Sequence, residues 1–225
     1  MASSQHALHA EGAGRVRKRA HEIVDAAARV FAEKGFHGTS THHIAEELGL
    51  RQASLYYYFT SKEAALEQVC AHGVDGFVEA AEAISQSEGS PAEKIERLIQ
   101  AHLTPMETRR DYVRVFLNER RYLPSASRKR IGRAGRRLER IFQSVIESGI
   151  ADGTFRPDID ARTATLALLG MCNAVINWNP AEPGAGAEHL TREFAGIVLS
   201  GMGLRAGKPR PARRRPQIKG SGRRG

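Results

Sequence analysis

Apolar residues recur at helical spacing along almost the whole chain, and no segment shows the strict alternation of a β-strand. Residues 15–34 form the first helical segment, and residues 40–48 and 51–58 predict two short helices. Longer helices are expected at residues 61–88, from 91 to a kink or end at Pro105, around 113–117, and at 125–150, 158–178 and 187–204. The pattern therefore predicts an all-α protein of about nine helices.

Several residues are of types that commonly begin or end helices, and they lie at the ends of the predicted helices. Gly35 follows the first helix as a stop, and Gly49 supplies a tight turn between the two short helices. Residues 60–63 and 90–93 have the spacing of capping boxes, and Pro91 fits the first position of a helix. These signals place the boundaries of the predicted elements.

The predicted elements divide the chain into four parts. Residues 1–14 are small and polar and predict a disordered arm. Residues 15–60 predict a three-helix domain containing a helix-turn-helix, and residues 61–204 predict a second domain of about six helices. Residues 205–225 form a basic tail, rich in Pro, Gly and Arg, that cannot bury a core and is expected to be disordered.

The basic tail accounts for the whole net charge of the chain. The chain carries a formal charge of +9, and the tail holds nine Lys and Arg residues and no acid. The rest of the chain is formally neutral, so the overall charge does not describe the folded part. The tail either adds non-specific affinity for phosphate or only aids solubility, and the sequence leaves both interpretations open.

Other features limit the class of protein. No apolar run is long enough to span a bilayer, and the first residues lack the apolar core of a signal peptide, which predicts a soluble, cytoplasmic protein without membrane contact. Cys70 and Cys172 lie at apolar helical positions and are expected in the core. No nucleophile, phosphate-loop or metal motif is present, and neighbouring His42 and His43 point in different directions. We expect no enzyme activity, metal or cofactor.

Residues 35–66 contain the most informative pattern. In the second short helix, Leu55 and Phe59 face inward, so the opposite face presents polar groups that can reach base edges and phosphates in a major groove. These groups belong to Arg51, Gln52, Ser54 and Tyr57.

The order of residues in this segment closely resembles the DNA-binding domain of TetR-type regulators. The resemblance covers residues 15–66 and rests on Gly35-Phe36, Thr39, Ile44-Ala45, Gly49, Leu55-Tyr56-Tyr57-Tyr58-Phe59 and Ser61-Lys62-Glu63. One departure is Ala53, where the family often has glycine.

The resemblance implies a role for each matching position. Thr39 is expected to cap the second helix and touch a phosphate, and His42 to face the groove. Arg51, Gln52 and Ser54 are expected in the groove. Phosphate contacts are expected from Tyr57, Tyr58 and Lys62. Tyr56, next to Leu55, is expected in the core.

The family resemblance also implies that the second domain binds a small molecule and forms a homodimer. The last two helices are expected to build the dimer interface, as a four-helix bundle, although their apolar stripes also suit an internal core. One stripe contains Leu166, Leu169, Cys172, Val175 and Ile176, and the other contains Leu190, Phe194, Ile197 and Val198.

An arginine-rich segment interrupts the otherwise balanced charge of the second domain. Between residues 128 and 140 there are seven basic residues and one acid, and one helix face carries Lys129, Arg133, Arg136 and Arg140. Acids on neighbouring helices could balance this face, or it could bind an anionic ligand.

Residues 149–160 and 170–173, with Trp178, resemble family members that respond to acyl-CoA thioesters in lipid, aromatic-acid or sterol catabolism. Arg133, Arg136 and Arg140 are therefore candidate phosphate contacts. Trp178 is expected either to line the effector pocket or to lie in the core.

These observations predict a sequence-specific repressor. A homodimer would bind a pseudo-palindromic operator in double-stranded DNA, and a small-molecule effector, in our interpretation an acyl-CoA ester, would release it. The alternative is an architectural DNA binder that senses no ligand and uses its basic tail.

Overall fold

The computed structural model describes residues 2–179, 181 and 183–203. Within these residues the chain forms ten α-helices and two short 3-10 helices and no β-strand, which confirms the expected all-α class. The elements are α1 (Ala2–Gly38), α2 (Thr41–Glu47), α3 (Gln52–Leu55), α4 (Lys62–Val74), α5 (Phe77–Gln86), α6 (Pro91–Thr108), α7 (Arg110–Glu119), η1 (Arg120–Tyr122), α8 (Ser125–Ala151), α9 (Ala161–Ala174), η2 (Val175–Asn177) and α10 (Ala187–Met202).

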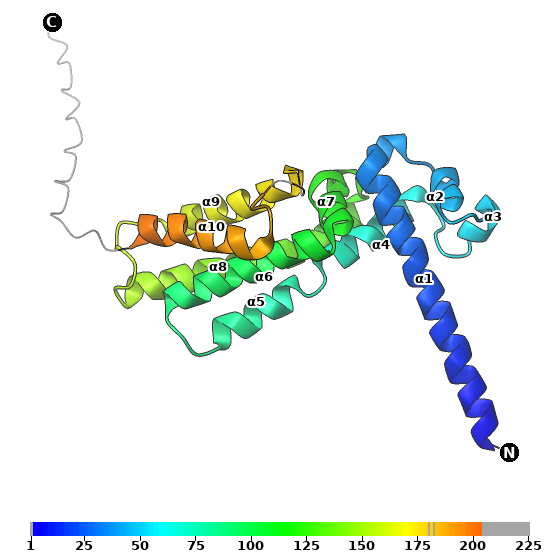
Figure 1. The fold of residues 1–225 in the computed structure, drawn as a ribbon, viewed down its shortest axis with the longest axis horizontal. Helices are drawn as coiled ribbons and strands as arrows, with labels where there is room; N and C mark the ends of the chain where they lie inside the picture. The colour runs from blue at the N-terminus through cyan, green and yellow to red at the C-terminus, as the bar shows by residue number, and fades with distance from the viewer. Residues whose placement is uncertain (1, 180, 182, 204–225) are drawn as a thin grey trace, which may run out of the picture.

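The helices form a head at one end of an elongated molecule and a body at the other (Figure 1). The head comprises α1 to α4, and α1 extends well beyond it. In the body, α6 packs against α8 and α10, while α8 packs against α5 and α9. Helix α7 lies at the junction, where it contacts both α1 and α4.

Two separate hydrophobic cores stabilise the head and the body. The head core contains Ile23, Phe31, Ile44 and Leu66, and it also includes residues of α7 and α8. The body core is formed by α5 to α10 and the adjoining loops. Because α4 belongs to the head core, the apolar contacts of the head continue past the predicted boundary at residue 60.

Both cysteines are buried, one in each core, as the sequence predicts. Burial raises the pKa of the Cys70 thiol and of the Cys172 thiol to about 12. Both thiols therefore remain protonated near neutral pH.

Helix α1 is longer than predicted. It begins at Ala2, so residues 2–14 are helical where the sequence predicts a disordered arm. Alanines recur through this stretch and favour continuation of a helix that has already nucleated. At its other end the helix is interrupted at Gly35 (φ 66°), the predicted stop.

The helix predicted at residues 61–88 is two helices in the structure. Helix α4 ends at Val74, and α5 begins at Phe77 after Gly76, which has a φ of 79°. Arg109 donates hydrogen bonds to the carbonyls of His72 and Asp75, at 3.2 and 2.8 Å. These bonds satisfy acceptors at the end of α4 and stabilise a break that apolar periodicity does not reveal.

The sequence predicts that Pro105 kinks or ends its helix; it lies inside α6 and does not end it. The helix continues to Thr108 because its buried face, including Leu103 and Met106, holds the last turn against the body core. The Ser90 and Glu93 capping box forms as predicted. The box expected at residues 60–63 does not form: Ser61 is the cap, its hydroxyl accepts from the N–H of Ala64, and an alanine at this third position has no side chain that could accept in return.

The helices near the C-terminus follow the prediction with small differences. Helix α9 begins after Asp160, whose carboxylate accepts from the N–H of Thr163 at 2.7 Å, and it passes into η2 before Trp178. Helices α8 and α10 match their predicted ranges closely. The basic tail at residues 205–225 lies outside the described residues. In the part of the chain that is described, no helix is long and apolar enough to cross a membrane.

Helix α4 lies very close to α7 at Gly73. A Cβ at this position would lie 2.7 Å from the carbonyl oxygen of Tyr112 and 2.9 Å from Cβ of Phe116. Both distances are shorter than van der Waals contact, and one involves backbone that cannot rotate away. Glycine is therefore required where the head meets the body.

We expect Gly73→Ala to lower the free energy of unfolding by about 1–3 kcal/mol, because overpacking forces α4 and α7 apart. Gly135→Ala is the matched control, since a Cβ there meets no atom within 4 Å. This control is expected to raise stability by about 0.5–1 kcal/mol through helix propensity. Urea unfolding followed by circular dichroism measures both values, and equal stabilities would contradict the close contact.

Candidate nucleic-acid interface and effector pocket

Ser40, rather than Thr39, caps the first helix of the helix-turn-helix. The Ser40 hydroxyl accepts from the N–H of His43 at 3.2 Å, and the His43 ring accepts from the N–H of Ser40 at 3.3 Å. Thr39 is 3% exposed, and its hydroxyl donates to the carbonyl of Gly35 at 2.8 Å. The predicted capping role of Thr39 is therefore wrong, because its side chain turns inward to the end of α1.

The turn between α2 and α3 is fixed by backbone hydrogen bonds. The N–H of Gly49 donates to the carbonyl of Glu46 at 3.0 Å, and the N–H of Leu50 donates to the carbonyl of Ala45 at 2.8 Å. This pairing is a Schellman motif, which needs a residue with positive φ. Gly49 has a φ of 62°, which explains the predicted turn glycine.

Helix α3 is shorter than predicted but presents the expected polar face. It spans Gln52 to Leu55, with Leu55 buried against the head core. The side chain of Gln52 donates to the Thr41 hydroxyl at 2.8 Å, which links α3 to α2. We define the recognition face as six of the exposed residues of this region, namely His42, Arg51, Gln52, Ser54, Tyr56 and Tyr57.

The three consecutive tyrosines have different environments. Tyr57 is 83% exposed, while Tyr58 is partly buried against the head core and meets the Tyr57 ring edge-on at 5.2 Å. Tyr56 is 51% exposed, so the expectation that it lies in the core is wrong. Leu55 and Phe59 are the buried pair at i and i+4, and Tyr56 is rotated away from both.

Lys62 forms hydrogen bonds inside the head. Its ammonium group donates to the carbonyls of Phe36 and Thr39, both at 2.9 Å, and lies 4.2 Å from the centre of the Phe36 ring. A cation is favoured there by the carbonyls at the end of α1. The sequence assigns Lys62 to a phosphate, whereas the structure places it as a support for the α1 to α2 connection.

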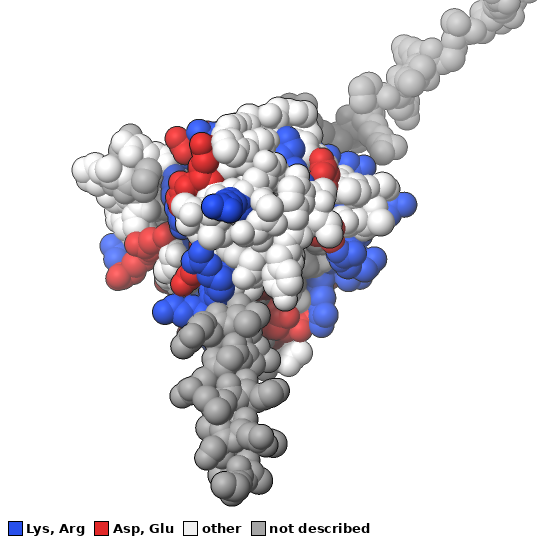
Figure 2. Space-filling view, turned by 90° about the vertical axis from the view of Figure 1, so that its right-hand side faces the viewer, with Lys and Arg blue, Asp and Glu red and all other residues white. Residues whose placement is uncertain are grey.

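The end of the head carries little charge. Figure 2 shows this end as a largely uncharged surface on which Lys and Arg side chains are scattered. His42 lies 3.2 Å from Glu46, and Arg29 pairs with Glu47 at 2.9 Å. The recognition face is therefore suited to hydrogen bonds with base edges more than to general attraction of phosphate.

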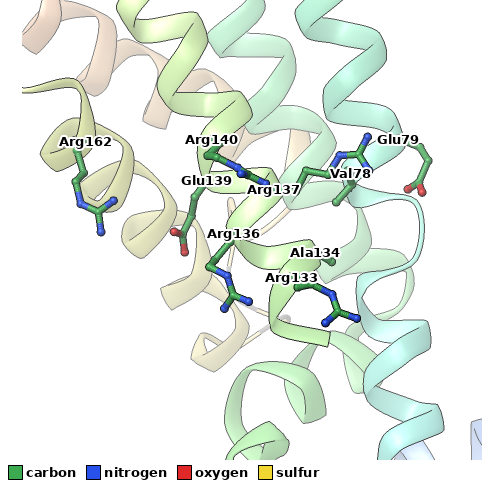
Figure 3. Close-up of a pocket in the computed structure, with 9 residues that line it drawn as sticks. All are labelled: Val78, Glu79, Arg133, Ala134, Arg136, Arg137, Glu139, Arg140 and Arg162. Atoms are coloured by element: carbon green, nitrogen blue, oxygen red, sulfur yellow. The ribbon is translucent and has the colours of Figure 1, made fainter. Parts of the chain in front are cut away.

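The arginine-rich face of α8 borders a hollow at the surface of the body. The hollow has a volume of about 830 Å³ and contains five arginines and two glutamates. Figure 3 shows Arg133 and Arg136 extending in the same direction, with Glu139 between Arg162 and Arg136. The arginines are Arg133, Arg136, Arg137, Arg140 and Arg162; we call this site the arginine hollow.

Neighbouring acids balance only part of the cationic face. Arg137 pairs with Glu82 at 2.5 Å, and Arg130 pairs with Glu67. Within the described residues, Arg133, Arg136, Arg140 and Arg162 form no ion pair. The structure therefore leaves a net positive site that the predicted residues Arg133, Arg136 and Arg140 share with Arg162.

An apolar pocket adjoins the arginine hollow, and Val78 and Ala134 line both. Its volume is about 40 Å³. Only two of its lining residues are polar, His102 and Asn173. The others are Gly73, Val74, Phe77, Val78, Met106, Val113, Phe116, Leu117, Ala134, Gly135 and Leu138. The sequence did not predict this pocket, because its lining residues come from six different helices that only the tertiary structure brings together.

Trp178 does not line either the arginine hollow or the apolar pocket. It is 41% exposed, contacts Phe194 edge-on at 6.1 Å, and its carbonyl accepts a hydrogen bond from Arg110. The structure thus does not bring Trp178 together with the predicted arginines.

Most residues of the two predicted dimer stripes are buried within the body. Leu169, Cys172, Val175, Ile176, Leu190 and Phe194 belong to the body core, and Val198 packs against it. Leu166 and Ile197 are instead exposed, at 47% and 62%. The stripes therefore describe an internal core, apart from these two residues.

The fold and this site define a helix-turn-helix regulator of transcription. The chain matches the family described as "Bacterial regulatory proteins, tetR family" over residues 23–69. It also matches "Tetracyclin repressor-like, C-terminal domain" over residues 88–202. The second match alone covers half of the chain, and the chain belongs to the TetR family.

Three proteins illustrate the similarity. The HTH-type transcriptional repressor KstR2 of Mycolicibacterium smegmatis is 26% identical over 82% of this chain and 90% of its own length. The crystal structure of PfmR from Thermus thermophilus is 30% identical, covers 81% of this chain and 98% of its own, and has a TM-score of 0.74. The structure of AibR in complex with isovaleryl coenzyme A and operator DNA shares the fold, at 23% identity, with coverage of 80% and 98% and a TM-score of 0.72.

The positions of Lys62 and Tyr57 lead to opposite expectations. Lys62→Met should lower the free energy of unfolding by about 1–3 kcal/mol, because two partly buried carbonyls lose their partner. Tyr57→Ala should change stability by less than about 0.5 kcal/mol, since its ring is exposed, but should weaken DNA binding.

Urea unfolding and operator binding measure the two effects. Lys34→Met is the matched control for Lys62→Met, because Lys34 is exposed. If the Lys62 and Lys34 variants are equally stable, the ammonium group does not support the head.

Proposed function

We propose that this chain is a homodimeric repressor that binds a pseudo-palindromic operator and releases it when an acyl-CoA ester binds. The observation that carries the proposal is that the arginine hollow adjoins the apolar pocket, since the two sites share Val78 and Ala134. A coenzyme A ester is divided in a corresponding way: its phosphates, at one end, suit the arginines, and its acyl group, at the other end, suits the apolar pocket. The complex of AibR with isovaleryl coenzyme A supports this effector class.

Operator binding is assigned to the recognition face and to Tyr58 beside it. Arg51, Gln52 and Ser54 are the groups we place against base edges, with Tyr57 and Tyr58 near phosphates. His42 lies beside them, and its ring is 61% exposed. Thr39 and Lys62 act indirectly in this proposal, since both are bound to the end of α1.

The homodimer is assigned to the outward faces of α9 and α10. These faces expose Leu166 and Ile197 among small residues such as Ala167, Gly170 and Gly196. Neither helix has a Lys, Arg, Asp or Glu between residues 163 and 174 or between 194 and 202. An uncharged surface of this kind, with exposed apolar side chains, suits burial against a second copy.

Effector binding requires the apolar pocket to widen. A pocket of about 40 Å³ is far smaller than typical ligand sites of roughly 300–1,000 Å³. An acyl group therefore favours a conformation in which the pocket helices have separated. Because an effector shifts an equilibrium only by its differential affinity, the widened state must be the one with lower affinity for the operator.

We first predict the effect of removing phosphate contacts. Arg133→Gln combined with Arg136→Gln should raise the acyl-CoA concentration needed for half-release at least tenfold, because two charge-assisted hydrogen bonds to phosphate are lost. The matched control is Arg128→Gln combined with Lys129→Gln, on the same helix but outside the hollow.

The measurement begins with selection of the operator from random DNA, followed by fluorescence anisotropy of the complex with free acids and their CoA esters. Release by esters alone, reduced only in the Arg133 and Arg136 variant, supports the proposal. An operator complex that no ester releases contradicts the effector assignment and leaves DNA binding intact.

A second prediction concerns base recognition. Arg51→Ala should relax the selected sequence at one position of each half-site and reduce discrimination there by about 1–3 kcal/mol. Arg97→Ala, an exposed substitution in the body, should leave the selected sequence unchanged. An unchanged base preference in the Arg51 variant would remove this residue from the groove.

A further inference from the structure

A histidine and an asparagine form a polar pair inside the apolar pocket. His102, on α6, is 6% exposed, and its Nε2 lies 3.0 Å from Oδ1 of Asn173 on α9. All other residues that line the pocket are apolar or glycine. The pair is thus the pocket's source of specific polar contacts.

The hydrogen bond with Asn173 determines the tautomer of the His102 ring. Because Oδ1 of Asn173 can only accept, Nε2 of His102 carries the proton and donates. Burial lowers the pKa of His102, although the hydrogen bond with Asn173 opposes this effect, so the ring is neutral near pH 7. The remaining ring nitrogen, Nδ1, then carries a lone pair and can only accept.

Nδ1 of His102 is buried and has no hydrogen-bond partner among the described residues. Such groups are rare in folded proteins, where the large majority of buried polar atoms are paired. The ring is also held in place, since Phe77 and Phe142 pack edge-on against it at 5.3 and 6.1 Å. The apolar pocket is therefore lined by a ring of fixed orientation whose Nδ1 is an unpaired hydrogen-bond acceptor.

We propose that Nδ1 of His102 accepts a hydrogen bond from a hydroxyl or N–H group on the apolar part of the effector. The pocket then favours a hydroxylated acyl chain or ring over the hydrocarbon of the same size. This inference rests on the proposed function for the identity of the effector, and it adds which acyl groups are selected. An effector without a donor leaves Nδ1 unpaired and binds about 5- to 150-fold more weakly.

The experiment compares CoA esters in pairs of equal carbon number, with and without one hydroxyl, for release of the operator complex. At least one hydroxylated ester should act at a concentration five or more times lower than its partner. His102→Phe keeps a flat ring between Phe77 and Phe142 but lacks the acceptor, so it should abolish this preference. His102→Gln, whose amide oxygen can accept, should retain part of it.

A second measurement separates this inference from the proposed function. Phenol and toluene are small probes of similar shape, and only phenol can donate. Phenol should stabilise the wild-type protein against thermal unfolding more than toluene does, and His102→Phe should remove the difference. This comparison needs no CoA ester.

The outcomes have distinct meanings. Equal responses to hydroxylated and plain esters, unchanged in His102→Phe, overturn the inference and leave the proposed function standing. If no ester releases the operator, the effector assignment fails, and the phenol comparison alone decides the role of His102. Equal stabilisation by phenol and toluene then overturns it. The operator affinity and the unfolding temperature of each variant, measured without any probe, show whether the variant is folded. If His102→Phe has a folding defect, His102→Gln is compared with the wild-type protein instead.

Discussion

The close contact between α4 and α7 at Gly73 is the constraint on which the relation between head and body depends. It brings the backbone of α4 against that of α7, and two consecutive arginines reinforce the same junction. Arg109 binds carbonyls at the end of α4, while Arg110 donates to the carbonyls of Ile176 and Trp178 beyond α9. One short segment thus satisfies helix ends that belong to the head and to the body.

The apolar pocket reaches this junction, because Gly73 and Val74 at the end of α4 form part of its wall. Its other walls come from α5 to α9, and the His102 and Asn173 pair joins two of them. A molecule that enlarges the pocket therefore acts at the contact that positions the head. This arrangement gives the proposed effector a direct physical connection to the orientation of the helix-turn-helix.

The sequence predicted features that depend on local chemistry and missed those that depend on long-range packing. Gly49 was identifiable because few other residues adopt its backbone conformation, and Leu55 and Phe59 because their spacing defines a buried face. The break at Gly76 depends on Arg109, more than thirty residues away, and the inward turn of Thr39 depends on carbonyls of α1. The arginines of α8 were visible as a pattern, whereas Arg162 and His102 reach their sites only through tertiary structure.

The internal use of Lys62 has a consequence for how the head responds to ionic strength. From residue 35 to 61 the chain has a single Lys or Arg, Arg51, and the ammonium group of Lys62 is bound to two carbonyls. If this segment binds the operator as proposed, its contacts displace few of the counterions condensed on DNA. The part of the affinity that distinguishes one sequence from another is then expected to change little between dilute and concentrated salt.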